Sequence, residues 1–255
     1  MQAVILAGGL GTRMREETEF RPKPMVEIGG KPVLWHIMKI LAAQGINEFI
    51  ICAGYKQEII RDYFLTLREK TQDFTIDFSA GAEVTLHDDF EEANWKVTVA
   101  DTGAYTMTGG RVKRISRYLR EEPFLITYGD GLADIDLKRL VDSHTQSHAT
   151  LSISTSIPRS RFGVVVSDES GKVNSFLEKP RSSENVNIGF MIAEHTLLDY
   201  LYDDSILEDE PVQRLVQEGK VNAYFHEGYW QPMDTQRELQ ALNHLWSEGA
   251  PWKIW

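Results

Sequence analysis

Glycines and a cationic side chain stand together near the start of the chain. An apolar run at residues 3–7 is followed by Gly8, Gly9 and Gly11, and Arg13 comes two residues later. Glycines after a strand allow the backbone to turn sharply and to approach a ligand closely. Backbone N–H groups and an arginine fork both bind phosphate oxygens. The segment therefore predicts a phosphate-binding loop, and the alternative is a plain turn with a solvated arginine.

A lysine held between two prolines follows this loop. Lys23 lies in the sequence RPKPM, where the prolines restrict the backbone and leave the ammonium group little entropy to lose on positioning. Two other phosphate-loop patterns do not fit. The pattern G-x-G-x-x-G would need a glycine at Met14, and the Gly-Lys pair at residues 30–31 is followed by proline instead of serine or threonine.

Two aspartates far apart in the sequence are candidate metal ligands. Asp130 lies between two glycines directly after the apolar run at residues 124–128, and Asp234 lies in QPMDT. Strand ends face the ligand crevice of an open α/β sheet, and Mg²⁺ takes few carboxylates together with phosphate oxygens. Asp130 could instead stabilise a turn, and Asp234 could cap the helix that follows it. Asp136 is predicted to be such a helix cap.

The composition limits the classes of function. The chain has 255 residues, a formal net charge of −11 and one cysteine, Cys52, inside an apolar run. An acidic chain suits neither nucleic acid nor anionic membranes, which favour a basic face. A lone cysteine provides no disulfide framework or metal set and fits a reducing compartment. With no visible signal peptide and no run long enough to span a bilayer, we expect a cytoplasmic protein without nucleic-acid or membrane partners.

Strand-like and helix-like stretches alternate along the chain. Short apolar runs predict strands, and apolar residues spaced three and four apart predict helices. The predicted strands lie at residues 3–7, 49–53, 74–78, 97–101, 124–128, 149–155, 162–167, 172–178, 189–194 and 221–227. The predicted helices lie at residues 34–42, 59–67, 112–119, 195–202, 209–218 and 235–248. This alternation predicts an α/β fold with a doubly wound, mostly parallel, mixed sheet.

Further motifs recur in order along nearly the whole chain. They are WHIMK, TGGR, YGDG, EKP and YWQPMDT, after the glycine loop and the proline-flanked lysine. With them the sequence resembles the sugar-phosphate nucleotidylyltransferase family, whose signature is G-G-x-G-T-R followed by P-K-P, and within it the glucose-1-phosphate cytidylyltransferase branch. The resemblance implies a Rossmann-like nucleotidyltransferase fold, Mg²⁺ as the cofactor, and CTP and an α-D-hexose 1-phosphate as substrates. It also implies the supply of CDP-glucose to deoxysugar and O-antigen (lipopolysaccharide) biosynthesis.

The candidate site residues are grouped by predicted role. Some roles are inferred from residue type and position, and the others are implied by the resemblance. The predicted catalytic residues are Arg13, Lys23 and Lys179. The predicted nucleotide-binding residues are Leu6, Ala7, Gly8, Gly9, Gly11, Thr12, Arg13, Lys23, Thr102, Gly110, Arg111, Gly129 and Asp130. The resemblance implies that the sugar-phosphate-binding residues are Gly163, Glu178, Lys179, Asn187 and Gly189. The predicted metal ligands are Asp130 and Asp234, and the resemblance favours the metal over a helix cap for Asp234.

The base-reading residues are proposed for a specific physical reason, and the sugar-binding segment departs from the family pattern at one position. Thr102 and Gly110 are candidates for reading the base, because glycine lets the backbone approach a pyrimidine edge closely. The alternative for Gly110 is the start of a helix. Ile188 stands where the family has a glycine between Asn187 and the next glycine, so the details of sugar contact differ from the family pattern.

We expect one nucleotidyltransferase domain over residues 1–255, with 1–135 mainly binding the nucleotide and 136–255 mainly the sugar phosphate. We also expect a homo-oligomer, in which Trp252 and Trp255 pack either within the chain or against a neighbouring subunit. His36 is predicted to be structural. The expected reaction is Mg²⁺-assisted in-line attack of the sugar phosphate on CTP. The alternatives are another nucleotide (dTTP or UTP), another sugar or alcohol phosphate, and a catalytically silent relative that binds a sugar nucleotide.

Overall fold

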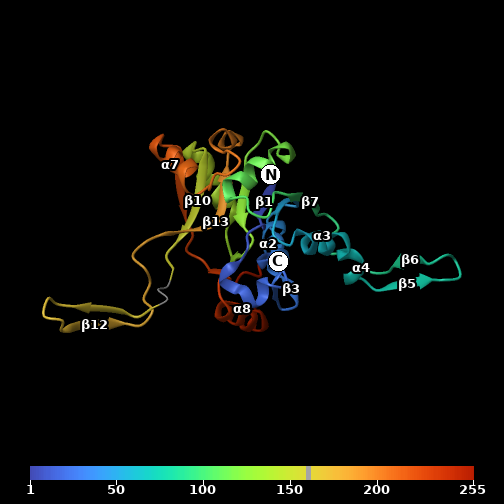
Figure 1. The fold of residues 1–255 in the computed structure, drawn as a ribbon, viewed down its shortest axis with the longest axis horizontal. Helices are drawn as coiled ribbons and strands as arrows, with labels where there is room; N and C mark the ends of the chain where they lie inside the picture. The colour runs from blue at the N-terminus through green and yellow to red at the C-terminus, as the bar shows by residue number, and fades with distance from the viewer. Residues whose placement is uncertain (159–161) are drawn as a thin grey trace.

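The central feature of the fold is a seven-stranded sheet. The computed structural model describes residues 1–158 and 162–255 (Figure 1). In spatial order the strands are β14 (Val221–Phe225), β10 (Leu151–Ser156), β13 (Val186–Ala193), β8 (Phe124–Tyr128), β1 (Ala3–Leu6), β4 (Glu48–Ala53) and β7 (Lys96–Asp101). Strand β13 runs antiparallel to β8 and β10, whereas the other neighbouring pairs are parallel. The predicted mostly parallel, mixed sheet is confirmed.

Helices cover both faces of this sheet. Side chains of β1 and β4 alternate between two hydrophobic clusters, so that Ile5 and Ile51 face one cluster while Val4 and Ile50 face the other. The first cluster is covered by α2 (Val33–Ala42), α3 (Gln57–Leu65), α6 (Leu137–Ser147) and α8 (Gln236–Glu248). The second is covered by α5 (Thr108–Arg114) and α7 (Glu210–Gln217). Burial on both faces explains why the central strands are continuous apolar runs.

The winding direction of the chain changes beside β1. From β1 the chain passes through α2 to β4 and then through α3 to β7, all toward one edge of the sheet. It then passes through α5 to β8, which pairs with β1 on its other side. The carboxyl ends of β1 and β8 therefore flank a topological switch point, where open α/β sheets bind ligands.

Two hairpins leave the body of the protein. Hairpin β5–β6 (Phe74–Asp77 and Glu83–Leu86) and hairpin β11–β12 (Val164–Ser167 and Val173–Leu177) extend in opposite directions (Figure 1). The sequence correctly predicts strands at 74–78, 162–167 and 172–178. These strands form separate two-stranded sheets outside the central sheet.

The remaining elements are short. They are α1 (Arg15–Thr18), α4 (Leu67–Thr71), the strand pairs β2–β3 (Glu27–Ile28, Lys31–Pro32) and β9–β15 (Gly131–Ala133, Trp230–Pro232), and the 3₁₀ helices η1 (Thr12–Met14), η2 (Lys23–Met25), η3 (Ser116–Tyr118) and η4 (His195–Tyr200). The helix predicted at 195–202 is therefore a 3₁₀ helix, and the helix predicted at 112–119 ends at Arg114. Within the described residues, no helix is long and apolar enough to cross a bilayer.

The aromatic tail packs against its own chain. Trp252 is fully buried and stacks on Trp246, with ring centroids 6.4 Å apart. Trp255 meets the edge of Trp35 at 5.8 Å. His36 lies within this cluster, fully buried beside Trp252, in agreement with the predicted structural role. Large aromatic rings of this kind stabilise a fold mainly through the apolar area that they bury.

Candidate active site

The glycine loop leaves β1 at the switch point. Gly11 adopts a left-handed conformation with φ of 62°, which glycine tolerates and most residues avoid. The Thr18 hydroxyl donates to the Gly11 carbonyl at 3.1 Å, and a Cβ added at Gly11 would lie 2.6 Å from the Thr18 methyl group. Gly11 therefore allows the chain to turn tightly into η1, which carries Arg13.

A buried arginine contacts the glycine loop through hydrogen bonds to its backbone. Arg111 is 4% exposed, and its guanidinium donates to the carbonyls of Gly8 and Gly103 and to the Thr102 hydroxyl, each at 2.7–2.8 Å. Burial lowers the pKa of Arg111 from its usual value, although an arginine stays charged at any physiological pH. The side chain lines the cavity, but these three contacts occupy much of its hydrogen-bonding capacity.

A short strand pair brings the two candidate metal ligands together. Asp130 directly precedes β9 and Asp234 follows β15, and Gly131 of β9 pairs with Pro232 of β15. The Met233 N–H also donates to the Asp130 carbonyl at 2.9 Å. The two carboxylates therefore meet although they are 104 residues apart in sequence (234 − 130).

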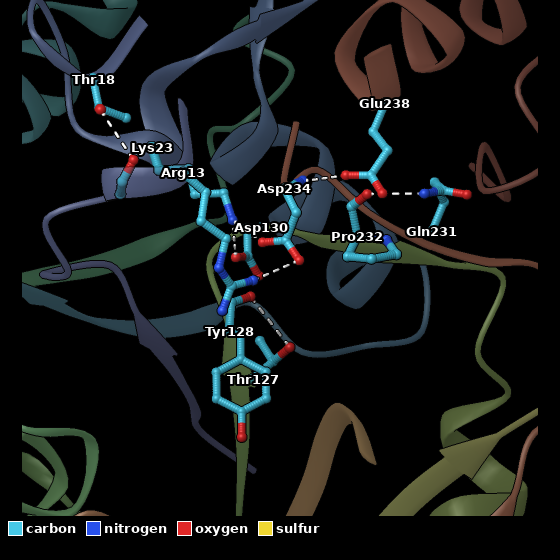
Figure 2. A network of polar contacts seen from close by, with 11 residues as sticks. Arg13, Thr18, Lys23, Thr127, Tyr128, Asp130, Gln231, Pro232, Asp234 and Glu238 are labelled. Atoms are coloured by element: carbon cyan, nitrogen blue, oxygen red, sulfur yellow. Dashed lines mark hydrogen bonds and ion pairs between the residues drawn. The ribbon is translucent and has the colours of Figure 1, made fainter. Parts of the chain in front are cut away.

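Helix capping does not account for Asp234. The N-cap of α8 is Thr235, whose hydroxyl accepts from the Glu238 N–H at 3.2 Å. The Asp234 side chain is directed instead toward Lys23 and Arg13 (Figure 2). Asp136 does cap α6, because its carboxylate accepts from the Arg139 N–H at 3.0 Å. The cap alternative for Asp234 is thus wrong, and the cap prediction for Asp136 is confirmed.

Lys23 lies between the two carboxylates. Its Nζ is 2.5 Å from Asp130 Oδ2 and 2.8 Å from Asp234 Oδ1, and Arg13 reaches the other Asp234 oxygen at 2.8 Å. Burial alone would lower the pKa of Lys23, but the charge of Asp130 and hydrogen bonds to both aspartates raise the pKa above its usual value. The lysine is therefore a cation at neutral pH.

The same two carboxylates suit a divalent cation. Carboxylate oxygens are ligands that Mg²⁺ prefers, and Mg²⁺ usually takes one or two carboxylates and completes its shell with phosphate oxygens and water. No cluster of three or more histidine, cysteine, aspartate or glutamate side chains that could hold a metal occurs in residues 1–158 and 162–255. A metal at this site would accordingly need oxygens from the substrates as well as from Asp130 and Asp234.

A cavity of about 440 Å³ joins these groups. Its lining includes most of the predicted nucleotide-binding and metal-binding residues: Leu6, Ala7, Gly8, Gly9, Gly11, Thr12, Arg13, Lys23, Arg111, Gly129, Asp130 and Asp234. It also includes residues that the sequence did not single out: Pro24, Thr106, Met107, Thr108 and Tyr128. Tyr128 was missed although it is the last residue before the YGDG glycine, a position from which a side chain can reach a ligand at the strand end.

Thr102 and Gly110, the two candidates for recognising the base, are not among the residues that line the cavity. Thr102 is fully buried and its hydroxyl donates to the Ala53 carbonyl at 2.7 Å. The Gly110 N–H donates to the Ser205 carbonyl at 3.0 Å, and a Cβ on Gly110 would lie 2.1 Å from the carbonyl oxygen of Asp203. Gly110 thus permits close packing of α5, whose first residue is Thr108, against the segment at residues 203–205. Thr106 and Thr108, which lie between Thr102 and Gly110 in the sequence, do line the cavity.

One half of the predicted sugar site borders the cavity. Asn187 Nδ2 donates to the Tyr128 hydroxyl at 3.1 Å, and Gly189 adopts φ of 78°. A Cβ on Gly189 would lie 3.0 Å from the Tyr128 ring. The Tyr128 hydroxyl donates to Glu208 Oε1 at 2.5 Å, and burial together with this carboxylate raises the pKa of Tyr128. Tyr128 therefore remains a protonated hydrogen-bond donor.

The other half is associated with the projecting hairpin β11–β12. Gly163 precedes β11, and Glu178 and Lys179 follow β12. A Cβ on Gly163 would lie 3.2 Å from Glu178 Oε2, and Lys179 Nζ is 3.4 Å from Glu178 Oε1. These residues are close to one another but are not among those that line the cavity. Their predicted role in binding the sugar phosphate stays a prediction.

Comparison with known proteins shows the family to which the chain belongs. The family model described as nucleotidyl transferase matches residues 2–243. The chain is 45% identical to the glucose-1-phosphate cytidylyltransferase of Salmonella typhi and 42% identical to the probable glucose-1-phosphate cytidylyltransferase of Bacillus subtilis, in both cases over the full length of both chains. The crystal structure of HddC from Yersinia pseudotuberculosis is similar with a TM-score of 0.72 and 26% identity, covering 96% of this chain and 99% of that one. The chain belongs to the nucleotidyl transferase family.

Proposed function

We propose that the protein transfers a cytidylyl group from CTP to α-D-glucose 1-phosphate, giving CDP-glucose and diphosphate. The observation that carries this proposal is the meeting of a glycine loop, two aspartates and a mostly buried lysine at one switch point. This arrangement provides what transfer of a nucleotidyl group between phosphates requires, namely fixed donors and cations around phosphate oxygens. The base and the sugar follow from relatives that bear the name of this activity and are 42–45% identical over their full length.

The reaction requires positioning and charge neutralisation more than proton transfer. The attacking group is a phosphate oxygen that is already anionic, so no general base is needed. In the proposed arrangement the loop at Gly8–Gly11 and Arg13 hold the phosphates that leave as diphosphate. Lys23 stabilises the charge that develops on the α-phosphate. Lys179 binds the phosphate of the incoming sugar and thereby aligns it for in-line attack.

Magnesium would neutralise phosphate charge between the two substrates when it is bound at Asp130 and Asp234. These two residues present their carboxylates toward one point. We further propose that the segment from Thr102 to Gly110 reads the base, with Thr106 and Thr108 as its side chains in the cavity. The nucleotide and sugar-phosphate substrates, together with the single buried cysteine, favour a cytoplasmic location and a place in deoxysugar and O-antigen synthesis.

Exposed apolar residues on the hairpins favour a homo-oligomer. On β11–β12 the side chains of Val165, Val173 and Phe176 are 54–61% exposed, and Phe78 at the turn of β5–β6 is 80% exposed. A two-stranded hairpin is marginally stable alone, and contiguous exposed apolar surface usually marks a protein contact. We propose that both hairpins contact other copies of this chain. Sedimentation velocity of the purified protein tests this, and a monomer at micromolar concentration contradicts it.

The catalytic proposal is tested by diphosphate release in the presence of Mg²⁺. CTP, UTP and dTTP are each combined with glucose 1-phosphate, and CTP is then combined with other sugar and alcohol phosphates. UTP and CTP exchange a donor for an acceptor on the base, and one unpaired buried group costs about 1–3 kcal/mol. We therefore expect kcat/KM for CTP to exceed that for UTP by about 10–100-fold. Equal use of both nucleotides would overturn the specificity, and no release with any pair would indicate a catalytically silent binding protein.

A further inference from the structure

Lys23 takes up the space between the two candidate metal ligands. Its Nζ lies 2.5 Å from an oxygen of Asp130 and 2.8 Å from an oxygen of Asp234. The lysine side chain is 12% exposed, and the Asp234 side chain is 16% exposed. By contrast, Arg13 contacts the outer oxygen of Asp234 and is 72% exposed. The Asp130 side chain is 30% exposed, so the least exposed part of the cluster is the ammonium group together with the Asp234 carboxylate.

The four side chains that contact one another directly carry balanced charges. Arg13 and Lys23 contribute two positive charges, and Asp130 and Asp234 contribute two negative charges. The Glu238 carboxylate accepts from the Asp234 N–H at 2.7 Å and adds a negative charge beside them. A lone carboxylate pair at this burial would be costly, because each charge needs a partner when it is removed from water. A divalent cation that entered the cluster would compete with the ammonium group for the same oxygens.

The backbone at Lys23 is fixed, whereas its long side chain contains several rotatable bonds. Pro22 and Pro24 flank the lysine, Pro24 is buried, and the Val26 N–H donates to the Lys23 carbonyl at 3.1 Å. A Cβ added at Gly11 would lie 3.3 Å from the Lys23 Cβ, so the stem of the lysine lies beside the glycine loop. Rotation about its four-carbon stem can therefore move the ammonium group from the carboxylates toward a phosphate on that loop.

We propose that Lys23 serves as an internal counter-ion that fills the metal position of the nucleotide-free protein and leaves the two aspartates when a nucleotide phosphate arrives. The proposal rests on the metal assignment under the proposed function and adds an order of events to it. Without nucleotide, Lys23 keeps divalent cations out. With nucleotide, phosphate oxygens replace the aspartates as partners of Lys23, and the metal enters together with the nucleotide.

The direct test is Mn²⁺ binding to the nucleotide-free protein, measured by electron paramagnetic resonance of free Mn²⁺. Wild-type protein should bind Mn²⁺ weakly. Lys23→Met should bind it about 10–100-fold more tightly, since a single hydrogen bond to a charged group contributes on this scale. Lys23→Gln removes the same charge and keeps a polar group, and it should behave similarly if Lys23→Met folds poorly. Equal Mn²⁺ affinity in the wild type and a folded Lys23 variant would overturn the proposal.

Two further variants identify the site that is measured. Lys39 is another buried lysine, 10% exposed and paired with Glu91, so Lys39→Met should destabilise the protein without creating Mn²⁺ affinity. Adding Asp234→Asn to Lys23→Met should abolish the gained affinity. Retention of that affinity would place the Mn²⁺ elsewhere and overturn the proposal.

A thermal measurement provides a readout independent of spectroscopy. Mg²⁺ should raise the melting temperature of nucleotide-free Lys23→Met, in which the two carboxylates lack their counter-ion, and should leave that of the wild type and Lys39→Met nearly unchanged. If wild type binds Mn²⁺ only with CTP but the Lys23 variants gain no affinity without it, the counter-ion role is wrong and the metal site of the proposed function stands. If no form binds Mn²⁺ with or without CTP, both are wrong.

Discussion

The Arg111 guanidinium donates a hydrogen bond of 2.8 Å to the Gly8 carbonyl, which joins α5 to the glycine loop. The contact is close because Gly8 has no side chain. A Cβ placed on Gly8 would lie 2.0 Å from Arg111 Nη1, whereas a Cβ on Gly9 would have nothing within 4 Å. Two adjacent glycines of the same motif therefore have different structural roles, one against a buried arginine and one facing open space.

Gly8→Ala should displace Arg111 and distort the loop. Overpacking of a tight site costs about 1–3 kcal/mol, so we expect a loss of that size in the free energy of unfolding, together with a raised KM for CTP. Gly9→Ala should change the free energy of unfolding by less than about 1 kcal/mol, in line with glycine replacements that introduce no strain. Urea unfolding of the two variants checks this. Equal destabilisation by both would show that the Arg111 contact is not the reason for glycine at position 8.

Asp130→Asn and Asp234→Asn test the two proposed metal ligands. Each should leave the circular dichroism spectrum unchanged and lower kcat by about a hundredfold or more, because a metal supplies several kcal/mol of charge stabilisation in the transition state. Asp136→Ala is the matched control. It removes the N-cap of α6, so it should cost about 1 kcal/mol of stability and leave kcat unchanged. Near wild-type turnover by either asparagine variant at saturating Mg²⁺ would exclude that residue as a ligand.

The sequence identified the parts of the site that depend on local signals. The apolar run before Gly8 and the one before Asp130 each reflect burial on both faces of a parallel sheet, and each ends at the crevice. Lys23 was found because proline marks a fixed backbone. These signals lie within a few residues of the functional groups, so they could be recognised without knowledge of tertiary contacts.

Contacts between residues that are distant in the sequence could not be predicted from the sequence alone. The sequence did not predict that the Arg111 side chain donates to the Gly8 carbonyl, 103 residues away, in addition to lining the cavity. The strand at 74–78 has the same apolar pattern as a sheet strand, but it pairs only with its hairpin partner and Phe74 is half exposed. Local pattern predicts a strand but does not tell which strand it pairs with, because pairing depends on the whole topology. Thr106 and Thr108 were missed for a similar reason. Thr106 lies just before α5 and Thr108 is its first residue, and the position of this helix start depends on packing against residues 203–207.

His36 should make stability depend on pH. Its Nε2 lies 2.9 Å from the Ile28 carbonyl, which requires a hydrogen on Nε2, and the Trp252 N–H is directed toward Nδ1. Both contacts suit a neutral ring, and burial lowers the pKa of His36 to about 4. An unfolded histidine takes up a proton below about pH 6.5, so the stabilising contribution is present above that pH and is lost as the pH falls toward 4.

The free energy of unfolding should therefore be about 2 kcal/mol lower at pH 5 than at pH 7 through this residue. Urea unfolding at a series of pH values measures the slope. His36→Gln keeps a donor for the Ile28 carbonyl but cannot titrate, so the difference between wild type and variant isolates the contribution of His36 from that of the other histidines. Parallel pH profiles for the two proteins would contradict the low pKa.

Replacing Lys23 and Lys179 by alanine should affect different kinetic constants of the enzyme. Lys23 lies in the cavity beside the aspartates and is assigned to the α-phosphate, where charge develops during the reaction. Lys179 lies next to hairpin β11–β12, 41% exposed and close to Glu178, and is assigned to a sugar phosphate that is charged before and during the reaction. An interaction that strengthens in the transition state affects kcat, whereas one already present in the ground state affects mainly KM.

Lys23→Ala should lower kcat by about 10²–10³-fold, the usual scale for one lost electrostatic stabiliser. Lys179→Ala should chiefly raise KM for glucose 1-phosphate and leave CTP binding nearly unchanged. Steady-state kinetics with each substrate varied in turn separate the two effects. Lys172→Ala, at a lysine in the turn of the same hairpin, controls for a general effect of removing a positive charge from the hairpin. If Lys179→Ala weakens only CTP binding, the lysine belongs to the nucleotide site. The base of hairpin β11–β12 would then have to be assigned to the triphosphate instead of the sugar.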